Sequence, residues 1–150
     1  MQSVRLHFLL FPAAVLAASA ALAHAEALER RFERDGVAVV AHPYRNNGRG
    51  AGDLIKVLPG LDGVECFNGS TPHEANLRAL YAARERGVAC LGAGDSHLVE
   101  RVGLYATRFF ETARDERDLI RMIRAGACEP MAWDGAAFVP AEEWTHAQMK

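Results

Sequence analysis

Short apolar runs alternate with helical patterns along most of the chain. The run GVAVVA at 36–41 is continuously apolar, which is typical of a strand buried on both faces of a parallel sheet. Three further runs predict strands, and two segments with helical spacing lie among them. This alternation predicts an α/β fold with mainly parallel strands, arranged as a sheet or a barrel. The further strands are expected at 63–67, 88–92 and 103–109, and the helices at 71–87 and 115–126.

Capping signals mark where the two helices begin. Thr71 is the expected N-cap of the first helix, Pro72 suits its first helical position, and Glu74 closes a capping box. Asp115 is the expected N-cap of the second helix. The connections have weaker patterns: a glycine- and asparagine-rich loop at 45–53, a short helix or strand at 54–58, and a short hairpin followed by a terminal turn after 127.

The first 25 residues allow two interpretations. Residues 6–23 lack Asp, Glu, Lys and Arg, and Ala23-His24-Ala25 follows them, so residues 1–25 resemble a signal peptide cleaved after Ala25. Alternatively, residues 1–12 form a buried strand ended by Pro12, and residues 13–34 form an alanine-rich helix. Composition alone favours the signal peptide.

Composition limits the classes of function. The chain has 150 residues, enough for one domain with a core, and 17 basic against 19 acidic residues give no specific signal for nucleic-acid binding. The three cysteines have no CxxC spacing, which disfavours a disulfide framework or a zinc knuckle. Each lies in an apolar run, so we expect Cys66, Cys90 and Cys128 to be buried free thiols.

Polar side chains follow or end three of the predicted strands. His42 follows the first strand, Glu65 lies near the end of the second, and Asp95 and His97 follow the third. Active sites of α/β folds lie at the carboxyl ends of strands. Asp95 and His97, two residues apart, would point to the same side of an extended segment. Imidazole and carboxylate together suit Zn, Mn or Fe, so the pattern favours a metal or acid–base site.

Structural roles remain open for the same residues. His42-Pro43 is also typical of a turn, isolated Asp-x-His pairs are common, and Glu65 could serve in an ion pair. A Ser-His-Asp triad at Ser96 and His97 is disfavoured, because adjacent side chains on an extended segment point apart and no G-x-S-x-G motif is present.

Four segments together resemble a known family. In order and approximate spacing they are similar to the PHP superfamily, the polymerase-and-histidinol-phosphatase metal-dependent phosphoesterases. The resemblance covers about residues 36–127 and implies a distorted (β/α)7 barrel with divalent metals at the carboxyl-end mouth. The segments are AHPYR at 41–45, GVECFNGST at 63–71, GAGDSH at 92–97 and VGLYATRF at 102–109.

The resemblance implies roles for individual residues. His42 is similar to the metal-binding histidine of the AHP motif, and Asp95 and His97 are similar to the terminal Asp-x-His ligands. Glu65 and Asn68 resemble the acidic strand residue and its partner, which orient a metal ligand.

The sequence departs from the family at its beginning, where no H-x-H motif is present. The segment RLHFLL at 5–10 instead resembles a mid-domain strand whose histidine is a ligand, so His7 becomes a candidate ligand. This resemblance favours the interior strand over the signal peptide, and a cytoplasmic protein over one exported after cleavage at Ala25. The expected organisation is a strand at 1–12, the C-terminal half of a PHP domain at 13–127 and a tail at 128–150.

The family chemistry is hydrolysis of a phosphate ester by a metal-activated water. Arg45 is the first choice for binding the phosphate, because its planar fork matches phosphate oxygens, and Arg101 and Asn68 are further candidates. Arg45 and Glu65 are the candidate catalytic residues. The candidate ligands of a Mn, Zn or Fe ion are His7, His42, Asp95 and His97.

Two alternative functions are kept. The chain could be a non-catalytic PHP remnant, or an exported metal-binding protein. A half barrel exposes strand edges, so we expect a homo-oligomer or a partner chain that completes the barrel. The enzyme interpretation expects a small phosphorylated substrate.

Overall fold

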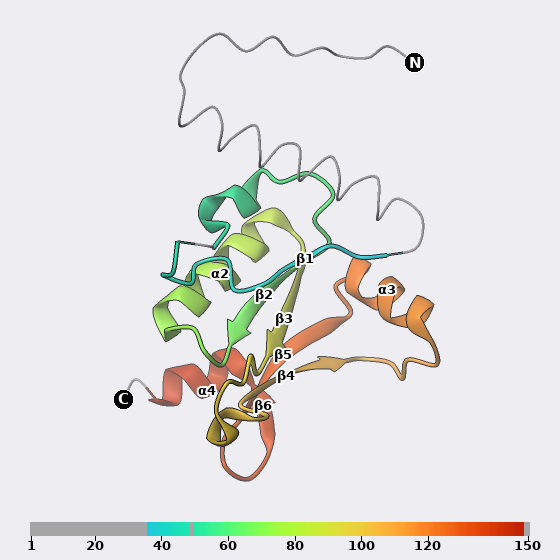
Figure 1. Ribbon diagram of the computed structural model, residues 1–150. Helices are drawn as coiled ribbons and strands as arrows, with labels where there is room; N and C mark the ends of the chain where they lie inside the picture. The colour runs from blue at the N-terminus through green and yellow to red at the C-terminus, as the bar shows by residue number, and fades with distance from the viewer. Residues whose placement is uncertain (1–35, 49, 149–150) are drawn as a thin grey trace, which may run out of the picture.

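The computed structural model describes residues 36–48 and 50–148. His7, the two interpretations of residues 1–25 and the helix expected at 13–34 lie outside the described residues. The elements, in chain order, are β1 (Val39–Val40), the 3₁₀ helix η1 (Gly52–Lys56), β2 (Gly63–Asn68), α2 (His73–Arg86), β3 (Ala89–Ala93), the 3₁₀ helix η2 (Val99–Arg101), β4 (Tyr105–Phe109), α3 (Glu116–Arg124), β5 (Cys128–Trp133), β6 (Phe138–Pro140) and α4 (Ala141–Gln148) (Figure 1).

The described strands form two three-stranded sheets. The first is parallel, in the order β1-β2-β3, and the second is antiparallel, in the order β4-β5-β6. The α/β class predicted from the sequence is therefore confirmed, but only the first sheet has the parallel arrangement. Alternation of strand and helix in the sequence does not distinguish a parallel from an antiparallel sheet. Here the helix α3 joins β4 and β5, which are antiparallel neighbours. The described strands do not close into a barrel.

Helix α2 covers the parallel sheet and connects β2 to β3 (Figure 1). It buries Ala79, Leu80, Ala82 and Ala83. It ends as predicted at Gly87, whose φ of 73° suits the left-handed conformation of a helix C-cap. The predicted N-cap was wrong: Pro72 occupies that position, and the Thr71 hydroxyl instead donates to Asn68 Oδ1 at 3.0 Å.

The other local predictions were mostly confirmed. Asp115 caps α3 by accepting a hydrogen bond from the Asp118 N–H at 2.9 Å. The expected hairpin is the pair β5–β6, but a helix, α4, follows it where a terminal turn was expected. The segment at 54–58 was expected to be a short helix or strand, and its residues 54–56 belong to the 3₁₀ helix η1, which contains the fully buried side chain of Ile55.

The main core lies between the parallel sheet, α2 and the second sheet. Phe67 of β2 contacts Tyr105 of β4 with 5.6 Å between ring centroids, and Tyr105 also contacts Trp144 of α4 edge-on at 5.9 Å. The three cysteines are free thiols as predicted, with Cys66 and Cys128 buried and Cys90 only half-buried. Among the helices of residues 36–48 and 50–148, none has the length and apolar character needed to cross a membrane.

Candidate functional site

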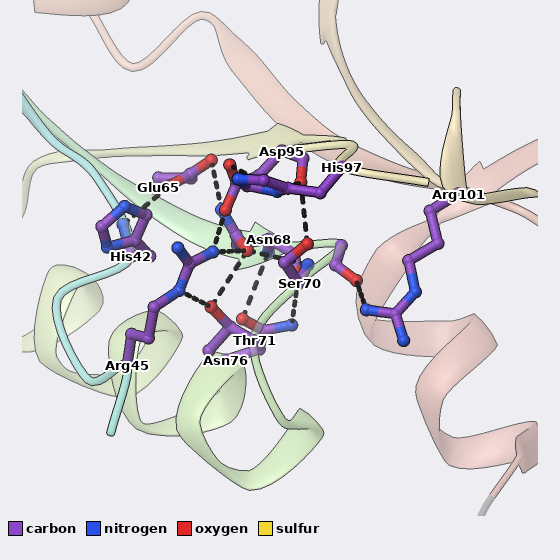
Figure 2. Close-up of polar contacts among 11 residues, drawn as sticks. His42, Arg45, Glu65, Asn68, Ser70, Thr71, Asn76, Asp95, His97 and Arg101 are labelled. Carbon is purple, nitrogen blue, oxygen red and sulfur yellow. Dashed lines mark hydrogen bonds and ion pairs between the residues drawn. The ribbon is translucent and has the colours of Figure 1, made fainter. Parts of the chain in front are cut away.

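The candidate site lies where the three parallel strands end. His42 follows β1, Asn68 is the last residue of β2, and Asp95 follows β3 (Figure 2). Because neighbouring parallel strands run in the same direction, their carboxyl ends lie at one edge of the sheet. The parallel pairing of β1, β2 and β3 therefore brings together polar residues that are far apart in the sequence.

Asn68 is the centre of this polar network. Its side chain is fully buried, and its amide Nδ2 donates to Glu65 Oε1 at 2.9 Å and to Asp95 Oδ2 at 3.1 Å. We call the group Arg45, Glu65, Asn68 and Asp95 the Asn68 network. The carbonyl Oδ1 of Asn68 accepts hydrogen bonds from Arg45 Nη2 at 2.9 Å, Ser70 N at 2.9 Å and Thr71 Oγ1 at 3.0 Å.

Arg45 points its guanidinium into the network (Figure 2). Its Nη2 donates to Asn68 and also contacts the carboxylate of Asp95, and its Nε lies 3.4 Å from Thr71 Oγ1. Its Nη1 has no hydrogen-bond partner among the residues that the structure describes, and 18 % of the side chain is exposed. A turn orients Arg45, because its backbone N–H donates to the His42 carbonyl at 3.1 Å.

Glu65 is a buried carboxylate with both oxygens engaged. Oε2 accepts the His42 backbone N–H at 2.6 Å, and Oε1 accepts the Asn68 amide. Glu65 therefore positions the His42 backbone and does not itself face an open space. His42 has a φ of 32°, and its ring Nδ1 is buried without a hydrogen-bond partner among residues 36–48 and 50–148. An unpartnered buried ring nitrogen suits a metal ligand or the acceptor of a substrate proton.

Asp95 and His97 lie together but not on an extended segment. Asp95 has a φ of 43°, so the extended geometry expected from the sequence was wrong at this position. The two side chains are still neighbours: His97 Nδ1 lies 2.9 Å from the Asp95 carbonyl oxygen and 3.8 Å from its Oδ1. The His97 side chain is 73 % exposed. Both His42 and Asp95 have positive φ values, which are uncommon for non-glycine residues and occur more often at functional sites.

The ends of β2 and β3 approach each other closely beside Asp95. A side chain at Gly69 would place its Cβ 2.3 Å from the Gly94 carbonyl oxygen, so only glycine fits there. Ser70 adds a second link, because its Oγ donates to the Asp95 carbonyl oxygen at 2.7 Å. These contacts fix Asp95 relative to Asn68.

Three predicted site residues of the described chain are not members of the Asn68 network, and two of them, His42 and His97, adjoin it through Glu65 and Asp95. The third, Arg101, is exposed, and its guanidinium donates to the Gly69 carbonyl oxygen at 3.4 Å (Figure 2). His7 lies outside the described residues.

Sequence reasoning missed the supporting contacts of Ser70, Thr71 and Asn76. Asn76 of α2 accepts the Asn68 N–H at 3.2 Å and donates to the Asn68 carbonyl at 3.1 Å, which holds the end of β2 against the helix. The run Asn-Gly-Ser-Thr at 68–71 was a signal for these contacts, since Ser and Thr close to Asn often bond to it or its backbone.

A groove of about 670 Å³ borders the network on the Arg45 side. Tyr44 lines it, with the Arg78 guanidinium 4.4 Å from its ring centroid and its hydroxyl donating to Asp53 at 2.7 Å. Burial, and the hydrogen bond to Asp53, raise the pKa of Tyr44 to about 12. Tyr44 is therefore a neutral phenol across the physiological pH range.

The donor types suit a divalent cation, but the described donors do not converge on one point. No group of three or more His, Cys, Asp or Glu within 36–48 and 50–148 is placed to hold a metal ion. The Asp95 carboxylate contacts Arg45 and Asn68 instead. The unpartnered His42 Nδ1 fits a ligand, yet these residues alone do not form a metal centre.

One family model matches the segment of the chain that contains Asp95 and His97. Residues 73–128 match the family model described as PHP-associated. This segment is similar to the C-terminal region of PHP proteins. It runs from the start of α2 to the first residue of β5 and includes Asp95 and His97, while Arg45 and Asn68 precede it. No curated protein and no solved structure matches the chain.

Proposed function

We propose that this chain carries the phosphate-binding side of a PHP-type metal-dependent phosphoesterase. The observation that carries the proposal is the convergence of Arg45, Asn68 and Asp95 at the carboxyl edge of the parallel sheet. The match of residues 73–128 to the PHP-associated family supports it independently.

Arg45 is the proposed phosphate ligand. Its Nη1, which bonds to none of the residues that the structure describes, offers donors to a phosphate oxygen, while Asn68 and Asp95 hold the guanidinium in place through Nη2. With Nε and Nη2 engaged, the two Nη1 hydrogens are the donors left for phosphate, and the guanidinium keeps its charge at all physiological pH values. Tyr44 and the groove beside it offer space and a phenolic group for the remainder of a small phosphorylated substrate.

His42, Asp95 and His97 are the proposed ligands from the described residues for a Mn, Zn or Fe ion. Such an ion, when bound, supplies a hydroxide at neutral pH and polarises the phosphoryl oxygen. Glu65 holds the His42 backbone, and Asn68 holds the Asp95 carboxylate. Further donors must come from beyond the described residues, and His7 or a second chain could supply them.

We also propose that the two sheets belong to an incomplete PHP-type barrel. The edge of the parallel sheet supports this, because β1 pairs only with β2 among the described strands and its Val39 is 39 % exposed. A free parallel edge favours pairing with another strand, either of this chain or of a partner.

A second candidate function is a non-catalytic PHP relative that binds a phosphate group without hydrolysing it. The contact between Arg45 and Asp95 favours it, because a carboxylate neutralised by an arginine is a poorer metal ligand. An assay of phosphate release, together with phosphate binding, separates the two candidate functions.

The test is phosphate release from p-nitrophenyl phosphate by the full chain, with Mn²⁺, Zn²⁺ or Fe²⁺ added in turn. A phosphoesterase gives metal-stimulated turnover that Asp95→Ala and Arg45→Gln abolish. Arg108→Gln is the matched control, since Arg108 pairs with Glu129 on the second sheet, away from the network. Turnover that persists in both site variants contradicts the proposal, and phosphate binding without turnover supports the non-catalytic candidate.

A further inference from the structure

Three free cysteines lie on strands β2, β3 and β5, and none of them belongs to the Asn68 network, although Cys66 directly follows Glu65. Cys66 is on β2, Cys90 on β3 and Cys128 on β5. The register pairs Val64 with Cys90, and a bulge follows between Glu65 and Phe67, so Cys66 lies diagonally across from Cys90. The Cys66 and Cys90 side chains interact across this strand pair, and the Cys66 thiol donates to the Val64 carbonyl oxygen at 3.4 Å. The diagonal position places the two thiols on adjacent strands, where a small movement can bring the sulfur atoms together.

A cavity of about 250 Å³ opens onto Cys90. It lies between β3, β5 and the start of α4, and Cys128 also lines it, whereas Cys66 does not. The guanidinium of Arg84 and the carboxylate of Glu142 pair across its wall at 2.7 and 3.0 Å. A small solute can therefore meet Cys90 from the cavity, while Cys66 stays fully buried behind it.

The two cavity cysteines differ in their surroundings. The neighbouring Cys66 thiol lowers the pKa of Cys90 and the charge of Arg84 lowers it further, while burial and the charge of Glu142 raise it. Burial raises the pKa of Cys66 and of Cys128. The Cys128 thiol donates to the Cys90 carbonyl oxygen at 3.9 Å. Cys90 lines the cavity and is only half-buried, whereas Cys66 and Cys128 are buried, so Cys90 is the thiol that a solute meets most readily. The thiolate is the reactive form of a cysteine.

We propose that Cys90 is a site of reversible oxidation by hydrogen peroxide, with Cys66 as the resolving thiol. The Cys90 thiolate attacks one peroxide oxygen, the O–O bond breaks, and hydroxide leaves, which oxidises Cys90 to a sulfenic acid. The Cys66 sulfur then displaces the sulfenic oxygen, which leaves as water with the Cys66 proton. A Cys66–Cys90 disulfide results, and two thiols have been oxidised for one peroxide reduced to water. The inference does not depend on the phosphoesterase proposal.

The first test compares alkylation rates in the reduced, folded full chain. Limiting iodoacetamide is added, and peptide mass mapping follows each cysteine with time. We expect Cys90 to react about tenfold faster than Cys128, which lines the same cavity and serves as an internal control. Equal alkylation rates of Cys90 and Cys128, a faster Cys128, or no labelling of Cys90 would overturn the proposal. The wild-type chain is sufficient for this test, because Cys128 is its internal control.

The second test follows the product after treatment with hydrogen peroxide. We expect a linked pair of peptides containing Cys66 and Cys90, which dithiothreitol separates again. Cys66→Ala should stop the reaction at a sulfenic acid on Cys90 that dimedone captures, and Cys128→Ala should leave the disulfide yield unchanged. Oxidation of the wild-type chain without a Cys66–Cys90 link would contradict the role of Cys66.

Discussion

Removal of the Asn68 side chain is the most informative single change. Asn68→Ala deletes two donated hydrogen bonds, to Glu65 and Asp95, and three accepted ones, including that from Arg45. Hydrogen bonds to charged groups contribute about 1.5–3 kcal/mol each and neutral ones about 1 kcal/mol. Several partners are half exposed and can bond to water afterwards. We therefore expect a loss of about 4 kcal/mol in the free energy of unfolding.

Urea unfolding of the full chain, followed by circular dichroism, measures this loss. Asn76→Ala is the matched control, since Asn76 is also buried but bonds only to the backbone of Asn68 within this network. It removes two neutral hydrogen bonds and should cost about 2 kcal/mol. Under conditions where both variants are folded, only Asn68→Ala should weaken the binding of inorganic phosphate.

The reasoning would be refuted by a small effect of Asn68→Ala. A loss below about 1 kcal/mol would mean that the side-chain bonds are not formed, or that water replaces them at no cost. Equal phosphate affinity in Asn68→Ala and the wild type would show that Asn68 does not position Arg45.

Three further predictions concern stability. Gly69→Ala should cost about 1–3 kcal/mol, because its Cβ would lie 2.3 Å from the Gly94 carbonyl oxygen, and an unchanged melting temperature would contradict that packing. Asp115→Ala should cost about 1 kcal/mol through loss of the α3 cap, measured by urea unfolding. Hydrogen bonds from Arg114 hold the pKa of Asp118 well below its usual value. The ionised Asp118 carboxylate therefore contributes to the free energy of unfolding at neutral pH, and this contribution is lost on acidification. Asp118→Asn should therefore be less stable than the wild type at neutral pH, with a gap that narrows below about pH 4; a gap independent of pH would refute this.

The sequence predicted the parts of the fold that local chemistry controls. The run at 63–67 and the glycine at 87 set a buried strand and a helix end, and both lie where expected. The direction of β4 relative to β5 was not predictable in this way, because strand pairing depends on contacts distant in sequence. α4 was missed because its pattern is short and only weakly amphipathic.

The candidate site was partly predictable for a related reason. The order of polar residues after strands indicated that His42, Glu65 and Asp95 share one edge, since parallel strands end together. The partners of each side chain did not follow from the sequence. Thr71 has both a capping signal and a position beside Asn68, and only the packed structure shows that it contacts Asn68.

The affinity for inorganic phosphate tests the central claim most directly, because both candidate functions require it. Isothermal titration of the full chain should show binding that Arg45→Gln weakens by about 10- to 100-fold, the value of one charge-assisted contact. Arg108→Gln, which removes the same charge from the second sheet, should leave the affinity unchanged. Equal affinity in the wild type and Arg45→Gln would contradict the assignment of the Asn68 network as a phosphate site.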